Sequence, residues 1–233
     1  MGDCLMTSVI AISNIAGGTQ KTTASHSLAV AMVEYGKKVL LIDLDPRAEL
    51  TFNLGLERLR VGIVEMLQGS SLTQSNDITT EERFDFIGSD SRLSTINDIA
   101  LLQAFLSTLE NRFDVVVLDT PSAIDTRLAM AFNAADAIVI PASHSNHSMR
   151  GAVATSLIES RAEKYILAID QFKDSLAEHI QHTKIIDAVI PMTDGLDIAI
   201  ALKRSFLTTD KSSEFAQAYR EAAYSILEEL NLI

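Results

Sequence analysis

The sequence is organised around one stretch near its N-terminus: Ser13-Asn14-Ile15-Ala16-Gly17-Gly18-Thr19-Gln20-Lys21-Thr22-Thr23-Ala24-Ser25-His26-Ser27. An apolar run at residues 9–12 leads into it, and an alanine-rich helical pattern at residues 28–35 follows it. Strand, glycine turn, Lys-Thr-Thr and helix form the layout of a phosphate-binding loop. Small residues let backbone N–H groups point at an anion, and the helix N-terminus adds partial positive charge. The spacing predicts that Lys21 reaches β- and γ-phosphates and that the Thr22 hydroxyl coordinates Mg²⁺.

The loop departs from the usual pattern G-x-x-x-x-G-K-[ST] at two positions. Ile15 and Gln20 occupy the places of its first and last glycines. A glycine turn followed by a helix with an unrelated lysine would give similar letters, so the loop alone leaves a purely structural interpretation open. Two acidic strand ends, described below, favour the phosphate site. The residues expected to contact the nucleotide here are Gly17, Gly18, Thr19, Gln20, Lys21, Thr22 and Thr23.

Length and composition favour a single α/β domain over residues 1–233. Apolar residues make up 47% of the chain and charged residues 21%, which is typical of globular proteins. No apolar run approaches the roughly 20 residues that span a membrane, and no basic segment precedes the first apolar run, so we expect a cytoplasmic protein. The single cysteine, Cys4, excludes a disulfide framework within one chain. A net charge of −12 argues against a uniformly basic nucleic-acid binder, but it permits a small basic patch.

Strands and helices alternate along almost the whole chain. Hydrophobic periodicity predicts strands at residues 9–13, 39–42, 84–88, 115–118, 137–140, 165–169 and 184–190. It predicts helices at residues 22–35, 61–67, 96–109, 127–134, 148–161, 171–180, 197–204 and 213–230. We expect Pro141 and Pro191 to stop the strands that precede them. The alternation indicates an α/β fold with a mostly parallel twisted sheet and helices on both faces.

Three predicted strand ends carry chemistry, and in such sheets ligands bind beyond these ends. The first leads into the phosphate loop, the second ends in Asp43 and Asp45, and the third ends in Asp119. A buried strand that ends in Asp is the Walker B arrangement, whose carboxylate holds the metal shell. Each Asp alone could instead begin the turn after its strand. Together with the loop they predict a Mg–nucleotide site, with Lys21, Asp43 and Asp45 catalytic and Thr22, Asp43 and Asp119 at the metal.

Three segments resemble the deviant Walker ATPases, the family of the ParA partition proteins and MinD. They are Gly17-Gly18-Thr19-Gln20-Lys21-Thr22-Thr23, Val39-Leu40-Leu41-Ile42-Asp43-Leu44-Asp45-Pro46 and Val117-Leu118-Asp119-Thr120-Pro121. Val189-Ile190-Pro191 and the predicted helix that contains Tyr219-Arg220 resemble ParA proteins as well. The resemblance implies a P-loop fold of the deviant Walker type, ATP and Mg²⁺ as cofactors, and a nucleotide contact at Pro191.

The resemblance also implies a slow ATPase that closes into an ATP-sandwich homodimer. Such a dimer binds nonspecific DNA on the nucleoid and positions a plasmid, chromosome or carboxysome, while a ParB- or McdB-like adaptor stimulates hydrolysis. In this family a signature lysine reaches the partner's phosphates, and here that position is Ala16. The carboxysome-positioning McdA branch includes members in which a basic residue of the C-terminal half substitutes. Arg150 is our candidate for this role, with Lys164 as the next choice.

DNA contact in this scheme neutralises phosphates and does not read bases. The candidate residues are Lys203, Arg204, Lys211 and Arg220. They fit solvated surface charges equally well, because Asp210, Glu214 and Glu221 lie among them.

Other functions remain open. A MinD-like membrane switch requires a basic amphipathic C-terminal helix, whereas residues 221–233 contain acids and no Lys or Arg, so we expect no membrane contact. An electron-transfer enzyme on this fold would need cluster cysteines, which the chain lacks. Ala16 and Gln20 also suit a nucleotide-dependent dimer with very slow turnover. We interpret His26 as a packing residue and His144 and His147 as surface or interface residues.

Overall fold

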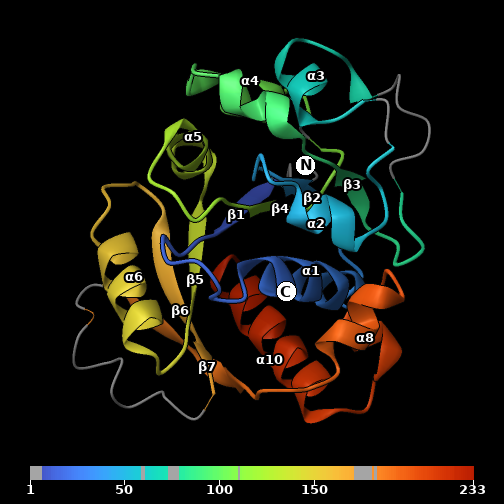
Figure 1. The fold of residues 1–233 in the computed structure, drawn as a ribbon, viewed down its shortest axis with the longest axis vertical. Helices are drawn as coiled ribbons and strands as arrows, with labels where there is room; N and C mark the ends of the chain where they lie inside the picture. The colour runs from blue at the N-terminus through green and yellow to red at the C-terminus, as the bar shows by residue number, and fades with distance from the viewer. Residues whose placement is uncertain (1–6, 59–60, 73–78, 110, 171–179, 181–182) are drawn as a thin grey trace, which may run out of the picture.

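The computed structural model describes residues 7–58, 61–72, 79–109, 111–170, 180 and 183–233. Seven strands form one sheet in the order β3-β2-β4-β1-β5-β6-β7, and every pairing between them is parallel (Figure 1). The strands are β1 Ser8–Ile12, β2 Val39–Asp43, β3 Asp85–Ile87, β4 Val115–Asp119, β5 Ala137–Ala142, β6 Glu163–Ile169 and β7 Lys184–Ile190. The expected α/β fold with a parallel sheet is therefore confirmed.

Helices cover both faces of the sheet (Figure 1). They are α1 Lys21–Glu34, α2 Glu49–Asn53, α3 Ile63–Leu67, α4 Ala100–Ser107, α5 Thr126–Ala134, α6 Asn146–Ser156, α8 Leu196–Ala201, α9 Phe206–Thr209 and α10 Glu214–Glu229, with a 3-10 helix at Ser91–Thr95. None of the helices in the described part of the chain is long and apolar enough to cross a membrane.

Two buried clusters lie on opposite faces of the sheet because neighbouring residues of a strand point to opposite sides. Ile10 and Ile12 of β1 join the cluster that contains α1 and α10, whereas Val9 and Ala11 join the cluster that contains α3, α4 and α5. Strands β2 and β4 are buried along their whole length. Central strands covered on both faces need continuous apolar runs, which explains why the sequence identified them.

The prediction that Pro141 ends its strand is wrong, because β5 continues to Ala142 and Pro141 pairs with Leu167 of β6. Pairing between β1 and β5 extends only to Val139, whose carbonyl accepts a hydrogen bond from Ser13 N at 2.9 Å. Alternate residues of a strand direct their backbone groups to the same neighbour, so Pro141 faces the β1 side beyond the end of β1. No hydrogen bond to a neighbouring strand is required from residue 141 there, so proline, which has no backbone N–H, is tolerated.

Other differences concern helix boundaries and short helices. The helix predicted at residues 148–161 begins at Asn146, after Ser145, whose Oγ accepts from Ser148 N, and ends at Ser156. The helix predicted at residues 96–109 is shortened to α4. Helices α2 and α9, of five and four residues, were not predicted, because such short segments show a helical period only weakly. The helix predicted at residues 171–180 lies outside the described residues, apart from Ile180.

Candidate functional site

The phosphate loop leaves β1 and is anchored by Asn14, which is fully buried. Asn14 Nδ2 donates to Pro141 O at 2.9 Å, and Asn14 Oδ1 accepts from Ala16 N at 2.9 Å. Two loop residues have left-handed backbones, Gly18 at φ 69° and Gln20 at φ 60°. Glycine adopts this conformation freely, but Gln20 adopts it at a cost because it carries a Cβ. The loop is therefore held in shape from β5 before it enters α1.

Lys21 folds back over this loop. Its Nζ donates to Ala16 O at 3.1 Å and to Ser122 Oγ at 2.7 Å, and the residue is 6% exposed. Burial lowers the pKa of the Lys21 ammonium against the opposing attraction of Asp119. A hollow of about 250 Å³ opens at this point, lined by Gly18, Thr19, Gln20, Lys21, Thr22, Thr23, Asp45, Arg47, Glu49, Thr120 and Ser122. Lys21 thus presents a cation at the floor of a loop-lined hollow.

Asp119 and Asp43 lie opposite each other at the ends of neighbouring strands. Thr22 Oγ1 donates to Asp119 Oδ2 at 3.0 Å, and Ser25 Oγ donates to Asp119 Oδ1 at 2.8 Å. Both carboxylates are buried. Burial raises the pKa of Asp119, and the charge of Asp43 raises it further.

Asp43 is held in a fixed orientation. It accepts hydrogen bonds from Thr51 Oγ1 at 2.7 Å and from the backbone N–H groups of Thr51 and Asp45, both at 3.0 Å. Burial raises the pKa of the Asp43 carboxyl despite these bonds. The two carboxylates and the Thr22 hydroxyl form an oxygen-only donor set that suits Mg²⁺. Within the described ranges no three His, Cys, Asp or Glu side chains cluster around a metal position.

Asp45 forms an ion pair with Arg47, a residue that was not predicted from the sequence to lie at the site. Arg47 Nη2 lies 2.7 Å and Nε 3.1 Å from Asp45 Oδ2, and Arg47 N donates to Asp45 Oδ1 at 2.9 Å. Ser122 was also missed, although its hydroxyl holds Lys21. Their positions in the sequence were the available signal: Arg47 follows Asp45 by two residues, and Ser122 follows Asp119 by three, where the chain turns at the site.

Arg150 lies beside Ala16, the position of the missing signature lysine. Both residues line a hollow of about 550 Å³. They come to the same hollow because α6 packs directly on the loop: a Cβ added to Gly151 would lie 2.5 Å from Ala16 Cβ. The alternative candidate Lys164 is wrong, because its Nζ donates to Ser156 O at 2.7 Å and Ile158 O at 2.5 Å. Those contacts tie Lys164 to the carboxyl end of α6, near the start of β6 and away from the loop.

Pro191 directly follows β7 and lines a hollow of about 440 Å³ together with Met192. Gln20 Nε2 lies 3.4 Å from Met192 Sδ, so this segment borders the phosphate loop. The structure therefore brings Pro191 to the same edge of the sheet as Lys21.

The four candidate DNA-binding residues do not form one patch of free cations. Arg204 forms an ion pair with Glu81, and Arg220 Nε lies 2.6 Å from Glu34 Oε2. Arg220 Nη1 also donates to Lys211 O at 2.7 Å, which places these two residues together. Lys203 Nζ donates to Phe52 O at 2.8 Å. Two of the four charges are thus shared with carboxylates.

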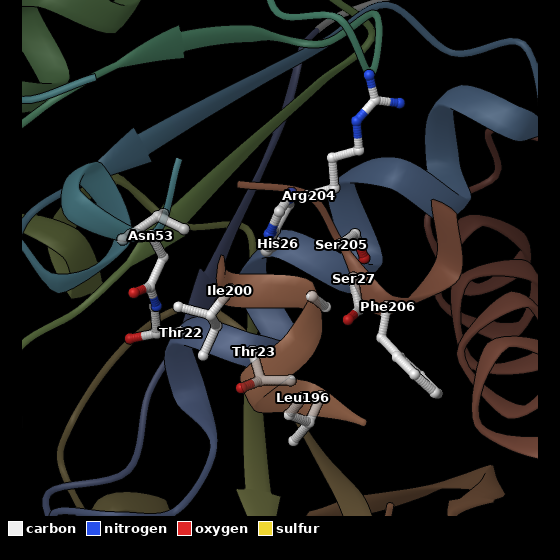
Figure 2. A pocket seen from close by; sticks show the side chains of 12 residues that line it. Thr22, Thr23, His26, Ser27, Asn53, Leu196, Ile200, Arg204, Ser205 and Phe206 are labelled. Atoms are coloured by element: carbon white, nitrogen blue, oxygen red, sulfur yellow. The ribbon is translucent and has the colours of Figure 1, made fainter. Parts of the chain in front are cut away.

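The segment that carries Arg204 packs against α1, the helix that follows the phosphate loop. Figure 2 shows Thr23 and His26 of α1, with Leu196, Ser205 and Phe206, among the residues that line a small pocket of about 30 Å³. His26 is more than a packing residue, since its Nε2 lies 2.5 Å from Oε2 of the buried Glu82. Glu82 also accepts from Ser205 N at 3.0 Å and from Thr208 Oγ1. Glu82 therefore links α1 to the start of α9.

Comparison with known proteins identifies a family and several relatives of this chain. The family described as "AAA domain" matches residues 7–166. The sporulation initiation inhibitor protein Soj of Bacillus subtilis is 25% identical over 95% of this chain and 98% of Soj. Maintenance of carboxysome distribution protein A of Synechococcus elongatus is 28% identical over 71% of this chain and 72% of that protein.

Solved structures share the fold. McdA of Cyanothece without nucleotide has a TM-score of 0.80 at 21% identity, and the match covers 94% of this chain and 99% of McdA. MinD of Pyrococcus horikoshii with Mg-ADP has a TM-score of 0.84 at 19% identity, covering 97% and 98%. The chain belongs to the AAA-domain family of ParA- and MinD-type deviant Walker ATPases.

Proposed function

We propose that this protein is a ParA-like ATPase that binds Mg-ATP at the carboxyl ends of β1, β2 and β4. The observation that carries the proposal is that Lys21 and Thr22 line one hollow while Thr22 binds the buried Asp119, which lies opposite Asp43 at the ends of neighbouring strands. Lys21 supplies a cation for the phosphates, and the carboxylates with Thr22 supply oxygen ligands that suit Mg²⁺. Membership of the ParA and MinD family supports the same activity.

Each residue of the site has a role in this proposal. Thr22 and Asp119 would hold Mg²⁺, and Asp43, fixed by Thr51, would order its shell. The metal would supply positive charge against the phosphates. Asp45 orients the attacking water. The remaining nucleotide contacts are Gly17, Gly18, Thr19, Gln20, Thr23 and Pro191.

A direct titration tests the site. Lys21→Ala should abolish Mg-ATP binding, because the phosphates lose their cation in the hollow. Lys38→Ala is the matched control, since Lys38 precedes β2 at the opposite edge of the sheet and its backbone N–H, not its side chain, binds Asp114. Unchanged ATP affinity in Lys21→Ala, or equal losses in both variants, would contradict the assignment.

We further propose an ATP-sandwich homodimer in which Arg150 replaces the signature lysine. Two triphosphates then approach one interface, and unit charges about 10 Å apart at an effective dielectric of ~20 repel by about 1.7 kcal/mol per pair. Arg150 is exposed beside Ala16, and its planar guanidinium can bind phosphate with two donors. Arg150→Ala should impair ATP-induced dimerisation, measured by light scattering, more than it impairs ATP binding by the monomer. Arg161→Ala is the control, and equal behaviour of the two variants would refute the role.

The dimer binds nonspecific DNA through Lys203, Arg204, Lys211 and Arg220 in this proposal, and an adaptor of the ParB or McdB type stimulates hydrolysis. Relatives named for chromosome partitioning and for carboxysome distribution support a partitioning role on the nucleoid. Because Arg204 and Arg220 already bind Glu81 and Glu34, DNA phosphates must displace these carboxylates. We therefore expect weak DNA binding that falls steeply with salt.

Two alternatives make different predictions. A MinD-like membrane switch needs a free amphipathic C-terminal helix, whereas Phe215, Ala222 and Ile226 of α10 are buried in the cluster with α1. That packing disfavours the membrane switch. A dimer with very slow turnover remains the second candidate, because Gln20 occupies a strained loop position. The ATPase rate measured with and without DNA separates this slow dimer from the partition ATPase, since only the partition ATPase needs repeated cycles of hydrolysis.

A further inference from the structure

Arg47 and Asp45 form a fork-to-carboxylate pair at the rim of the phosphate hollow. The Nε and Nη2 atoms of Arg47 both lie within 3.2 Å of Asp45 oxygens. The two side chains differ in exposure, with Arg47 63% exposed and Asp45 8% exposed. Asp45 is thus buried in the protein, whereas the Arg47 guanidinium lies largely in solvent where it lines the hollow.

The pair by itself does not indicate a ligand, because the same Asp-x-Arg arrangement recurs in this chain. Arg92 binds Asp90 with Nε at 3.0 Å and Nη2 at 2.6 Å, and Arg127 binds Asp125 with Nη2 at 2.6 Å. In each case a turn of the chain brings a carboxylate to the arginine two residues later. The arrangement is therefore a local structure that the sequence uses repeatedly.

The surroundings of Arg47 distinguish it from the other two arginines. Arg47 and Asp45 line the same hollow as Lys21, Thr22 and Ser122. The positive charge of Arg47 contributes to the lowered pKa of Lys21, after the larger effect of burial. Two cations therefore face one hollow, and Arg47 is the more exposed of them. Phosphate oxygens would match both.

We propose that Arg47 is a second cationic contact for the terminal phosphate of the bound nucleotide. Its ion pair with Asp45 occupies the guanidinium until that phosphate binds. The inference rests on the proposed Mg-ATP site. A terminal phosphate carries more charge than one carboxylate and accepts the same two parallel N–H bonds, so it can compete for the guanidinium. Transfer of Arg47 to the phosphate leaves the oxygens of Asp45 available to the attacking water. One movement would then bind the γ-phosphate and release the group that orients water.

Comparing ATP with ADP tests this inference, because only ATP has the phosphate that Arg47 is proposed to contact. In Arg47→Ala we expect Mg-ATP binding to weaken about tenfold, or about 1.4 kcal/mol, with Mg-ADP binding within about twofold of the parent chain. Arg47→Lys keeps the charge but loses the fork, so its ATP loss should be intermediate. Asp45→Ala frees the guanidinium, and this variant should bind ATP at least as tightly as the parent chain.

Arg92→Ala is the matched control, since it breaks the same local pair outside the hollow and should change neither affinity. Thermal unfolding without nucleotide checks that Arg47→Ala and Arg92→Ala are both folded. Equal losses for ATP and ADP in Arg47→Ala would mean that Arg47 only shapes the loop, and no loss for either would remove it from the site; both results overturn the inference. If the parent chain binds neither nucleotide, the proposed function and this inference are both refuted. If the parent chain binds both nucleotides, a negative result for Arg47→Ala refutes only the role of Arg47.

Discussion

Gly151 gives the sharpest mutational test of how the phosphate loop is supported. It lies on α6, and a Cβ built on it would approach Asn14 Oδ1 to 2.3 Å and Ala16 Cβ to 2.5 Å. Neither neighbour can move easily. Asn14 is fully buried and hydrogen-bonded to Pro141 O and Ala16 N, and Ala16 is 5% exposed. Gly151→Ala must therefore displace α6 or the loop.

The expected cost follows from this overlap. Inserting a methyl group into a packed site costs about 1–3 kcal/mol, and rigid neighbours on two sides put Gly151→Ala near the upper end. For a chain of 233 residues, 1 kcal/mol shifts the unfolding midpoint by about 2–4 °C, so we expect a decrease of roughly 5–10 °C. ATP binding should weaken as well, because α6 also holds the loop through Thr155 Oγ1, which accepts from Ile15 N at 3.0 Å.

Gly17→Ala is the control for the stability measurement. A Cβ at Gly17 would meet only Ser122 Oγ, at 4.0 Å, which is ordinary contact. Thermal unfolding of the two variants without nucleotide should therefore differ by several degrees. Equal unfolding midpoints for Gly151→Ala and the parent chain would show that α6 does not contact the loop as closely as the structure indicates.

Three further predictions concern turnover, DNA binding and pH. Asp45→Ala should bind ATP yet accumulate as the ATP-bound dimer, because the group that orients water is lost; hydrolysis at the parent rate in a phosphate-release assay would contradict this. Reversing Lys203 and Arg204 to Glu should weaken ATP-dependent DNA binding and flatten its dependence on salt, and an unchanged slope would place the contact elsewhere. Burial would raise the pKa of Glu82, but the hydrogen bond and charge of His26, together with the hydrogen bonds from Thr208 and Ser205, lower it below its ordinary value of 4.5. Glu82 then contributes stability that is present above pH 4.5 and is lost as the pH falls through its lowered pKa. Urea unfolding should therefore show Glu82→Gln less stable than the parent chain at pH 7, with a gap that narrows in acid; a constant gap would exclude the ionised carboxylate as the cause.

The sequence alone predicted the elements whose signal is local. Strands β1, β2 and β4 were identified because strands buried on both faces require continuous apolar runs, and the bounds predicted for β7 match the structure. The phosphate loop and the acids at the strand ends were identified because glycine spacing and strand ends are properties of adjacent residues. Parallel strands then bring Asp43 and Asp119 to the same edge of the sheet, which makes the core of the site predictable as well.

Charge partners that are distant in sequence depend on the tertiary packing. Arg204 and Glu81 are 123 residues apart, and Arg220 and Glu34 are 186 apart, so no local pattern could show that the expected DNA-binding cations are shared with carboxylates. Lys164 illustrates the same limit, since its charge suited the site but its position at the start of β6 directs it to the end of α6. The close approach of Gly151 to the loop likewise depends on how α6 crosses the sheet. Residue type specifies what a side chain can bind, but the packing of helices on the sheet determines which groups come within reach.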